Sequence, residues 1–192
     1  TLFPYPTLFR SKTITASSGA FTITVDDAAT VAEGKTIIDT TSVTNIVFTI
    51  GLSDTLANCM NVNAIHGSLS NIITADSDIN IGLSTINTIT ASQITHLNLV
   101  TDVTTGTVTA TIDGNIAQLD DLAANTSQTG TCALTIIVAD AVTVTTGKVV
   151  VDATSVASVT FTTGVSDTLA NCIDTGAIHS DLTAIKNKHG SI

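Results

Sequence analysis

Carboxylates are the most numerous side chains in this chain that could do chemistry. There are 16 acidic residues against six lysines and arginines, and all the acidic residues except Glu33 are aspartates. Such groups could bind a divalent cation or act as an acid and a base. Most, however, follow an expected strand or begin an expected helix, where an aspartate caps free backbone N–H groups. We therefore interpret six of them as caps: Asp26, Asp27, Asp54, Asp113, Asp140 and Asp167.

The segment ADSDIN, with Asp76 and Asp78, comes closest to a metal-binding motif. It resembles the start of a calcium-binding loop, but the glycine and the final glutamate of such a loop are missing at the required spacing. Asp120 and Asp121 are interpreted as the solvated face of a helix. We expect no metal site.

Histidine, serine and glycine form no recognisable catalytic or phosphate-binding motif. His66 and His179 are equivalent positions of an internal repeat, which indicates a structural role, and His96 and His189 stand alone. No HxxxH or CxxC pair is present to bind zinc, and no GxSxG turn to present a nucleophile. Gly34-Lys35 lacks the preceding glycine of a phosphate-binding loop. We predict no enzyme, no catalytic, cofactor-binding or metal-binding residues, and no cofactor.

The three cysteines are not expected to form a disulfide. Cys59 and Cys172 occupy the same repeat position about four layers apart, or roughly 20 Å at the spacing of stacked strands, whereas a disulfide needs Cα atoms within about 7 Å. Both are interpreted as small buried apolar residues, and Cys132 as unpaired.

An internal repeat organises the chain. Residues 22–69 and 135–182 align without a gap at an offset of 113, with 27 identities in 48 positions. The motif SDTLANC occurs at Ser53–Cys59 and again at Ser166–Cys172. Long-period self-similarity is typical of architectures in which each unit buries its apolar face against its neighbours.

The first eleven residues differ abruptly in composition from the rest. They contain both prolines, the only tyrosine and the only arginine of the chain. The segment resembles the in-frame translation of a sequencing adapter, so we interpret residues 1–11 as a non-native scar. An aromatic capping strand is the alternative. No polar cap is visible at His189–Ile192, and we expect a fragment truncated at both ends.

Composition limits the possible partners. The net charge of −10 argues against binding to nucleic acid or to an anionic membrane surface. The mean hydropathy is +0.45, yet no apolar run approaches the roughly 20 residues that span a bilayer. Aromatic residues make up only 3% of the chain, so the core must be built from Ile, Val, Leu and Ala, which suits stacked layers.

The repeated segments predict alternating strands and helices. In the first copy we expect strands at 21–25 and 45–50 and helices at 26–39 and 53–69, the second of which would begin at Ser53 and Asp54. In the second copy the strands are 134–138 and 158–163 and the helices 141–153 and 166–186. The segment TVTTGKVVV (143–151) favours a strand by propensity, so this helix stays open.

The middle of the chain, 72–131, is interpreted as a diverged copy. IITAD (72–76), TINTIT (85–90) and TGTVTATID (105–113) predict strands, and 91–102 and 115–125 predict helices. Strands joined by helical crossovers pair in parallel. We therefore predict one α/β solenoid domain over 12–192, of strand–helix units with a parallel sheet and repeat copies at about 21–71, 72–132 and 133–186. The alternative is a mainly-β right-handed parallel β-helix with short helices.

Three motifs resemble repeats of very large secreted or surface proteins of bacteria: VSDTLANCI (165–173), TASQITHLNLVTD (90–102) and TTGTVTATIDGNIAQLDDLAANT (104–126). The resemblance covers most of 21–192 and implies a stretch of an adhesin-like or surface-layer-like protein. Such repeats often lie beside calcium-binding nonapeptides, but no GGxGxD occurs here, so calcium binding does not carry over. The resemblance supplies no catalytic residues.

We therefore expect a structural segment of a secreted or cell-surface protein with a scaffold or adhesion role. Its partners would be neighbouring repeats of a longer parent chain and cell-surface or matrix components, without nucleic acid or membrane insertion. The alternative is an ice-binding solenoid, because Thr-x-Thr occurs at 13–15, 22–24, 88–90, 107–111, 143–145 and 160–162. A trimeric fibre segment is a third possibility.

Overall fold

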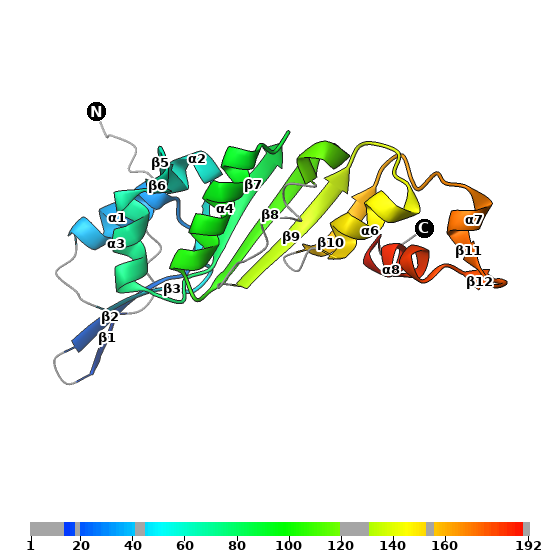
Figure 1. Ribbon diagram of the computed structural model, residues 1–192. Helices are drawn as coiled ribbons and strands as arrows, with labels where there is room; N and C mark the ends of the chain where they lie inside the picture. The colour runs from blue at the N-terminus through cyan, green and yellow to red at the C-terminus, as the bar shows by residue number, and fades with distance from the viewer. Residues whose placement is uncertain (1–13, 18–19, 41–44, 120–130, 153–155, 190–192) are drawn as a thin grey trace, which may run out of the picture.

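Short strands and short helices alternate along the chain (Figure 1). The computed structural model describes residues 14–17, 20–40, 45–119, 131–152 and 156–189. The strands are β1 (Ile14–Ser17), β2 (Ala20–Val25), β3 (Asn45–Phe48), β4 (Leu52–Asp54), β5 (Met60–Asn61), β6 (Ala64–Ile65), β7 (Ile81–Asn87), β8 (Thr107–Gly114), β9 (Thr131–Val138), β10 (Val156–Phe161), β11 (Ile173–Asp174) and β12 (Ala177–Ile178). The helices are α1 (Val31–Thr40), α2 (Leu56–Cys59), α3 (Gly67–Ala75), α4 (Ala91–Val103), α6 (Val144–Asp152), α7 (Leu169–Cys172) and α8 (Ser180–His189).

Five parallel strands form the main sheet, in the order β4, β7, β8, β9, β10, so each strand pairs with the next one along the chain. Val108 lies opposite Cys132, 24 residues later, and Ile136 lies opposite Val159, 23 residues later. A helix returns the chain between β7 and β8 and between β9 and β10. The mixed α/β class and the parallel sheet that the sequence predicted are confirmed.

A second sheet precedes the main one, with β1 antiparallel to β2 and β2 parallel to β3. Gly51 separates β3 from β4 and has a φ of +99°. A Cβ atom at this glycine would lie 2.1 Å from the backbone oxygen of Asn80. The residue that turns the chain from one sheet to the other must therefore be glycine, both for its conformation and for the close approach of the next strand.

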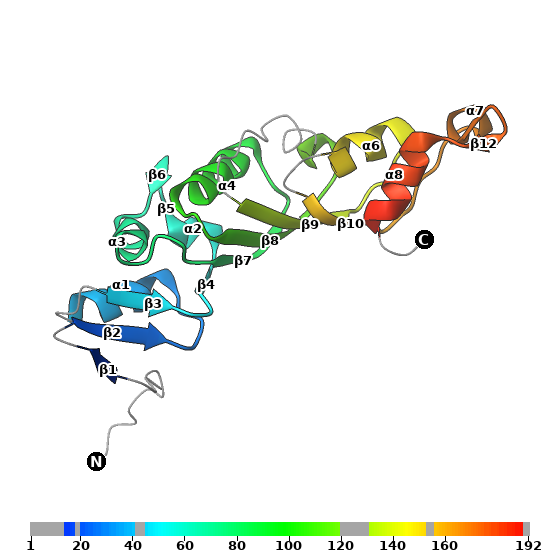
Figure 2. The same cartoon turned by 90° about the horizontal axis from the view of Figure 1, so that it is seen from below.

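Apolar side chains alternate along the main sheet and bury one of its faces. In β8, Val108, Ala110 and Ile112 are buried and the threonines between them are not. Ala110 and Ile112 lie opposite the buried Leu134 and Ile136 of β9, so rows of buried apolar side chains run across the two strands. Helices α4 and α6 lie on the same side of this sheet (Figure 2). The aliphatic core lies between that sheet face and the helices.

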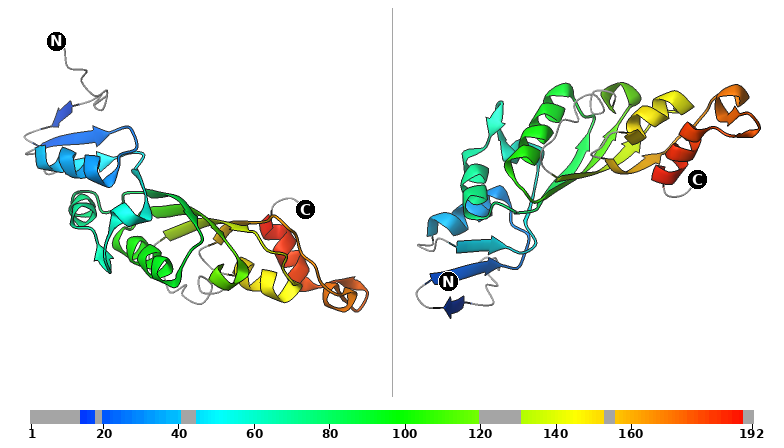
Figure 3. Two further views of the ribbon diagram at one scale, coloured as in Figure 1. Left: turned by 90° about the horizontal axis from the view of Figure 1, so that it is seen from above. Right: turned by 60° about the horizontal axis from the view of Figure 1, so that its bottom comes forward.

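Elements follow one another along an elongated molecule. The sheet β1–β2–β3 lies at one end and the segment α7, β11 and β12 at the other (Figures 1 and 3). Helix α1 packs against α3, and α6 packs against α8. Residues 1–11, interpreted above as a scar, lie outside the described residues.

Several predicted elements are confirmed. Strand β8 and helix α4 lie where 105–113 and 91–102 predicted them. The ambiguous segment TVTTGKVVV is helical, as α6, because Val144, Val150 and Val151 bury one side of it. Of the helix predicted at 115–125, residues 116–119 are helical and the remainder from 120 lies outside the described residues.

Other predicted elements are wrong. The helix predicted at 53–69 is divided: Ser53 and Asp54 end β4, α2 spans one turn, and a β5–β6 hairpin turns at Val62 with a φ of 54° before α3 begins. The helix predicted at 166–186 is divided in the same way. IITAD, predicted as a strand, forms the end of α3, where Ile72 is buried in the core.

Candidate functional site

The carboxylate of Asp54 is the centre of a polar site held by three hydrogen bonds. Its Oδ2 accepts a hydrogen bond from the backbone N–H of Val31 at 2.9 Å. Its Oδ1 accepts one from the N–H of Thr55 and one from the side-chain amide of Asn58, both at 2.7 Å. We call Val31, Asp54, Thr55 and Asn58 the first clasp. Because Asp54 is buried, three donors offset the cost of removing its charge from water.

The second copy builds the same arrangement. Asp167 accepts from the N–H of Val144 at 2.9 Å, and from the N–H of Thr168 and the side-chain amide of Asn171, both at 2.7 Å. These hydrogen bonds, that of Asn171 first, lower the pKa of Asp167. We call Val144, Asp167, Thr168 and Asn171 the second clasp. It is more open to solvent than the first.

Each clasp joins a downstream aspartate to the start of an earlier helix. Asp54 caps α1, which begins 23 residues before it, and Asp167 caps α6 over the same separation. Asp140 similarly accepts a hydrogen bond from the N–H of Ile116 at 3.2 Å. The capping role predicted for these three aspartates is confirmed, but the capped helix is the preceding one, not the next.

Asp26 and Asp27 do not cap α1, which corrects the prediction. Both are exposed, and α1 begins at Val31 behind Thr30. Thr30 and Glu33 bond each other's backbone N–H groups, at 3.2 and 2.9 Å, in a capping box. Asp26 only accepts a 3.4 Å hydrogen bond from the Thr49 hydroxyl.

His66 and His179 are N-caps, which fits the structural role expected of them. Nδ1 of His66 accepts a hydrogen bond from the N–H of Ser68, and Nδ1 of His179 accepts one from the N–H of Asp181, both at 3.2 Å. Each histidine therefore positions the start of a helix, α3 or α8.

A cavity of about 510 Å³ adjoins the first clasp, lined among others by Asp54, Asn58, Met60 and His66. A carboxylate and an imidazole thus line a common space. Asp54 accepts a hydrogen bond from the N–H of Val31 and His66 accepts one from the N–H of Ser68, so both groups hold the start of a helix. The geometry supports a structural junction here.

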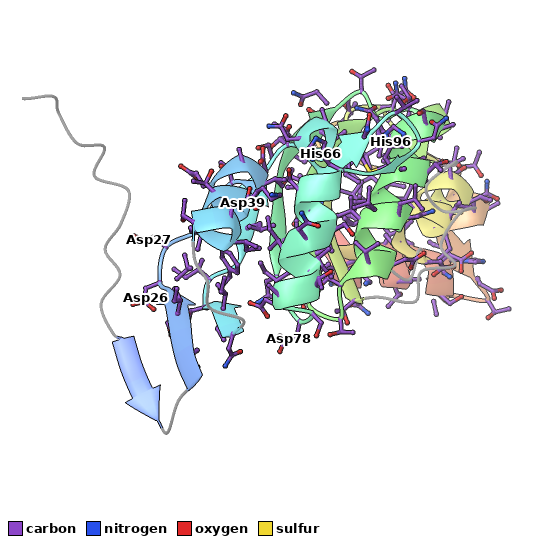
Figure 4. The ribbon with its side chains drawn as sticks, turned by 90° about the vertical axis from the view of Figure 1, so that its left-hand side faces the viewer. Asp26, Asp27, Asp39, His66, Asp78 and His96 are labelled. Atoms are coloured by element: carbon purple, nitrogen blue, oxygen red, sulfur yellow. The ribbon has the colours of Figure 1, made fainter. Side chains whose placement is uncertain are left out.

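The Asp76–Asp78 segment also has a structural task. Asp76 is buried and accepts a 2.7 Å hydrogen bond from the N–H of Phe48. Burial raises the pKa of Asp76, and the neighbouring Asp78 raises it further, against the opposing effect of the Phe48 N–H. Asp78 lies at the opposite end of α3 from His66 (Figure 4). Within the described ranges, no three His, Cys, Asp or Glu side chains gather as metal ligands.

The repeat equivalent of Asp76 is His189. Its Nδ1 accepts a 3.2 Å hydrogen bond from the N–H of Phe161, the counterpart of Phe48. An imidazole and a carboxylate thus fill the same acceptor position, which sequence comparison alone did not indicate.

His96 behaves differently from the other histidines. Its Nε2 atom is buried and has no hydrogen-bond partner among the described residues. The ring lines a cavity of about 260 Å³ with Leu56, Met60, Val62 and Gln93, at the contact between α2 and α4. The surroundings are mostly apolar, so this cavity offers no polar partner for a ligand beyond the ring and Gln93.

Gly34-Lys35 and Gly147-Lys148 serve helix packing. Lys35 pairs with Asp39 and Lys148 with Asp152, one turn later on each helix. Each glycine faces a buried isoleucine of the adjacent helix. All three cysteines are free. Cys59 is buried as predicted, whereas Cys172, which was predicted to be buried, is half-buried, as is Cys132.

Threonines gather on the sheet face opposite the core helices. Thr107, Thr109 and Thr111 alternate with the buried residues of β8, and Thr111 lies opposite Thr135 of β9. Thr135 accepts a 3.3 Å hydrogen bond from Ser158 of β10.

Other Thr-x-Thr pairs lie elsewhere. Thr143 precedes α6 and Thr145 lies within it, while Thr90 caps α4. Thr13 is outside the described residues.

Comparison with protein-family models, with curated proteins and with solved structures found no match for this chain. Within the described ranges, none of the helices combines the length and hydropathy needed to cross a bilayer.

Proposed function

We propose that this chain is a scaffold segment of a secreted or cell-surface protein, built as a solenoid of strand–helix units and without catalysis. The observation that carries the proposal is the series of hydrogen bonds from one unit to the next. Asp54, Asp140 and Asp167 each bind a helix start 23 or 24 residues earlier.

Buried side chains add to these connections. The hydroxyl of Thr104 donates a 2.7 Å hydrogen bond to the backbone oxygen of Ile79, 25 residues earlier. Asp76 accepts from Phe48 over 28 residues. Because such bonds are stronger away from water and costly to leave unmade, they resist separation of neighbouring units. A series of units tied in this way suits a spacer that must keep its length.

Surface chemistry fits the same role. Asp54 and His66 accept hydrogen bonds from backbone N–H groups at helix starts, and the net charge of −10 keeps such a segment soluble and disfavours nucleic acid. The resemblance to adhesin-like and surface-layer-like repeats supports an extracellular location. The partners would be neighbouring repeats and components of the cell surface or matrix.

The test uses antibodies raised against the purified chain, applied to intact and to lysed cells that express the parent gene. A surface scaffold predicts that intact cells are labelled and that mild protease treatment of these cells removes the label. Labelling that requires lysis would contradict the proposal.

A second candidate is ice binding, favoured by the Thr107, Thr109 and Thr111 column beside Thr135 and Ser158. Regularly spaced hydroxyl and methyl groups on a flat face could order water. The row is short, since Ala133 and Ile137 interrupt it on β9. Thermal hysteresis of the purified protein at micromolar concentration decides this: a freezing gap that Thr109→Lys abolishes supports it, and no gap excludes it.

A further inference from the structure

The two repeat copies expose one surface to very different degrees. Leu56 is 6% exposed, whereas its equivalent Leu169 is 74% exposed. Met60 is 7% exposed and its equivalent Ile173 is 42% exposed. Ile178, the equivalent of the half-buried Ile65, is 65% exposed. We call Leu169, Cys172, Ile173 and Ile178 the terminal patch.

The terminal patch is formed by adjoining elements with the local structure of the first copy. Ile173 lies opposite Ile178 in the β11–β12 hairpin, as Met60 lies opposite Ile65 in β5–β6. The N–H of His179 bonds the oxygen of Cys172 at 2.8 Å, as that of His66 bonds the oxygen of Cys59. The patch therefore differs from its counterpart in what covers it and not in its own fold.

In the first copy the covering element is α4. This helix contacts α2 and β6, which carry Leu56, Cys59 and Ile65. Its inner side is aliphatic, with Ile94, Leu97 and Val100 fully buried. Gln93 and His96 line the cavity beside Leu56 and Met60. Helix α4 thus provides the core contact that the terminal patch lacks among the described residues.

We propose that the terminal patch is the docking site for a helix of the α4 type, supplied by a further strand–helix unit of the same kind. This inference deepens the proposed scaffold function and rests on it. Large apolar side chains exposed as a contiguous group mark an interaction surface. The same surface already seats such a helix once within this molecule, which identifies the chemistry of the occupant.

That chemistry can be stated from α4 itself. The occupant is an amphipathic helix with aliphatic residues three positions apart, as at Ile94, Leu97 and Val100. It begins with a threonine capping box like that of Thr90 and Gln93. Its only charged residue within Ala91–Val103 is Asp102, near the C-terminal end.

The test extends the full chain by one unit. At the repeat offset of 113, Ile192 corresponds to Ile79, so a second copy of Asn80–Thr104 is appended directly after Ile192. Alkylation of Cys172 is then followed by mass spectrometry, with Cys59 as the internal reference for a buried thiol. If the appended helix docks, Cys172 should react at least ~10-fold more slowly than in the 192-residue chain, since labelling then requires local opening.

Matched variants separate docking from other effects. Leu97→Asp in the appended copy alone, or Leu169→Asp in the extended chain, should restore fast alkylation of Cys172. Ile50→Asp, at a residue 57% exposed outside the patch, should leave the slow rate unchanged.

Equal alkylation rates in the original and extended chains would overturn the proposal. So would a dimer of the 192-residue chain that Leu169→Asp dissociates, because a second copy would then be the occupant. Failure of surface labelling on intact cells would refute the scaffold function and leave these alkylation rates untouched, so the two failures are distinguishable.

Discussion

Gly34 and Ile72 lie so close that a methyl group on the glycine would collide with the isoleucine. A Cβ atom at Gly34 would lie 2.8 Å from Cδ1 of Ile72, and one at Gly147 would lie 2.9 Å from Cδ1 of Ile185. Both isoleucines are fully buried, so moving either side chain disturbs the core packed around it. The close packing of α1 on α3, and of α6 on α8, depends on the absence of a side chain at these glycines.

Gly34→Ala should therefore destabilise the protein. Overpacking costs about 1–3 kcal/mol, whereas alanine in a helix gains about 1 kcal/mol over glycine, so we expect a net loss of about 1 kcal/mol in the free energy of unfolding by urea. Gly67→Ala is the matched control, since a Cβ there meets nothing within 4 Å, and it should not destabilise. An increase in stability for Gly34→Ala would contradict the packing argument.

Removing the carboxylate of the first clasp should cost more than removing that of the second. Asp54→Ala leaves the buried N–H group of Val31 without its acceptor, at about 1–3 kcal/mol. Asp167→Ala should cost less, because solvent can reach the donors of the more open clasp. Urea unfolding of both variants measures the difference; equal losses would contradict it.

Asp76 should make stability depend on pH in the mildly acidic range. Its pKa is raised in the folded protein by burial and by Asp78, so the folded state binds the proton more tightly than the unfolded state. Stability from this group is therefore present at low pH and is lost as pH rises from the unfolded value near 3.8 through the folded pKa.

Asp167 contributes with the opposite sign. Its pKa is lowered in the folded protein, so its contribution to stability is present above pH 3.8 and is lost as pH falls through the folded pKa. Asp76→Asn should remove the pH dependence of stability above pH 3.8 and leave the pH dependence below pH 3.8 unchanged. The melting temperature measured against pH tests this. An unchanged profile above 3.8 in Asp76→Asn would argue against the assignment.

Cys59 should be inert towards alkylation in the native protein. Burial, with a smaller contribution from Asp54, raises its pKa to about 12, and the reactive species is the thiolate. At pH 8 we expect iodoacetamide to modify Cys172 before Cys59, with Cys59 reacting only when denaturant is added. Peptide mass spectrometry resolves the three sites, and rapid native labelling of Cys59 would show that its surroundings open readily.

The sequence predicted those elements whose periodicity is strong and undivided. The alternating threonines of 105–113 predicted β8, and the segment 91–102 was predicted as the helix that α4 forms. Prediction stayed open where tertiary contacts override local preference. The valines of α6 favour a strand by propensity, but Val144 and Val150 are buried in the core and Asp167 caps the helix from 23 residues away.

The candidate site was predictable only in part. That aspartates cap helices follows from their positions, but the identity of the capped helix depends on which strands pair, which no local pattern encodes. The role of Asn58 and Asn171 was missed, although both belong to the repeated SDTLANC motif. Their recurrence four residues after Asp54 and Asp167 was the available signal, because an amide at i+4 can reach back to a carboxylate at the start of a helical turn.

The backward direction of the aspartate caps has a consequence for synthesis. Helix α1 receives its carboxylate from Asp54 and α6 receives its own from Asp167, each 23 residues downstream. On the ribosome, neither helix can receive this cap until the 23 residues that follow its start have emerged from the exit tunnel. Capping of each helix during translation therefore lags behind its synthesis by that length of chain.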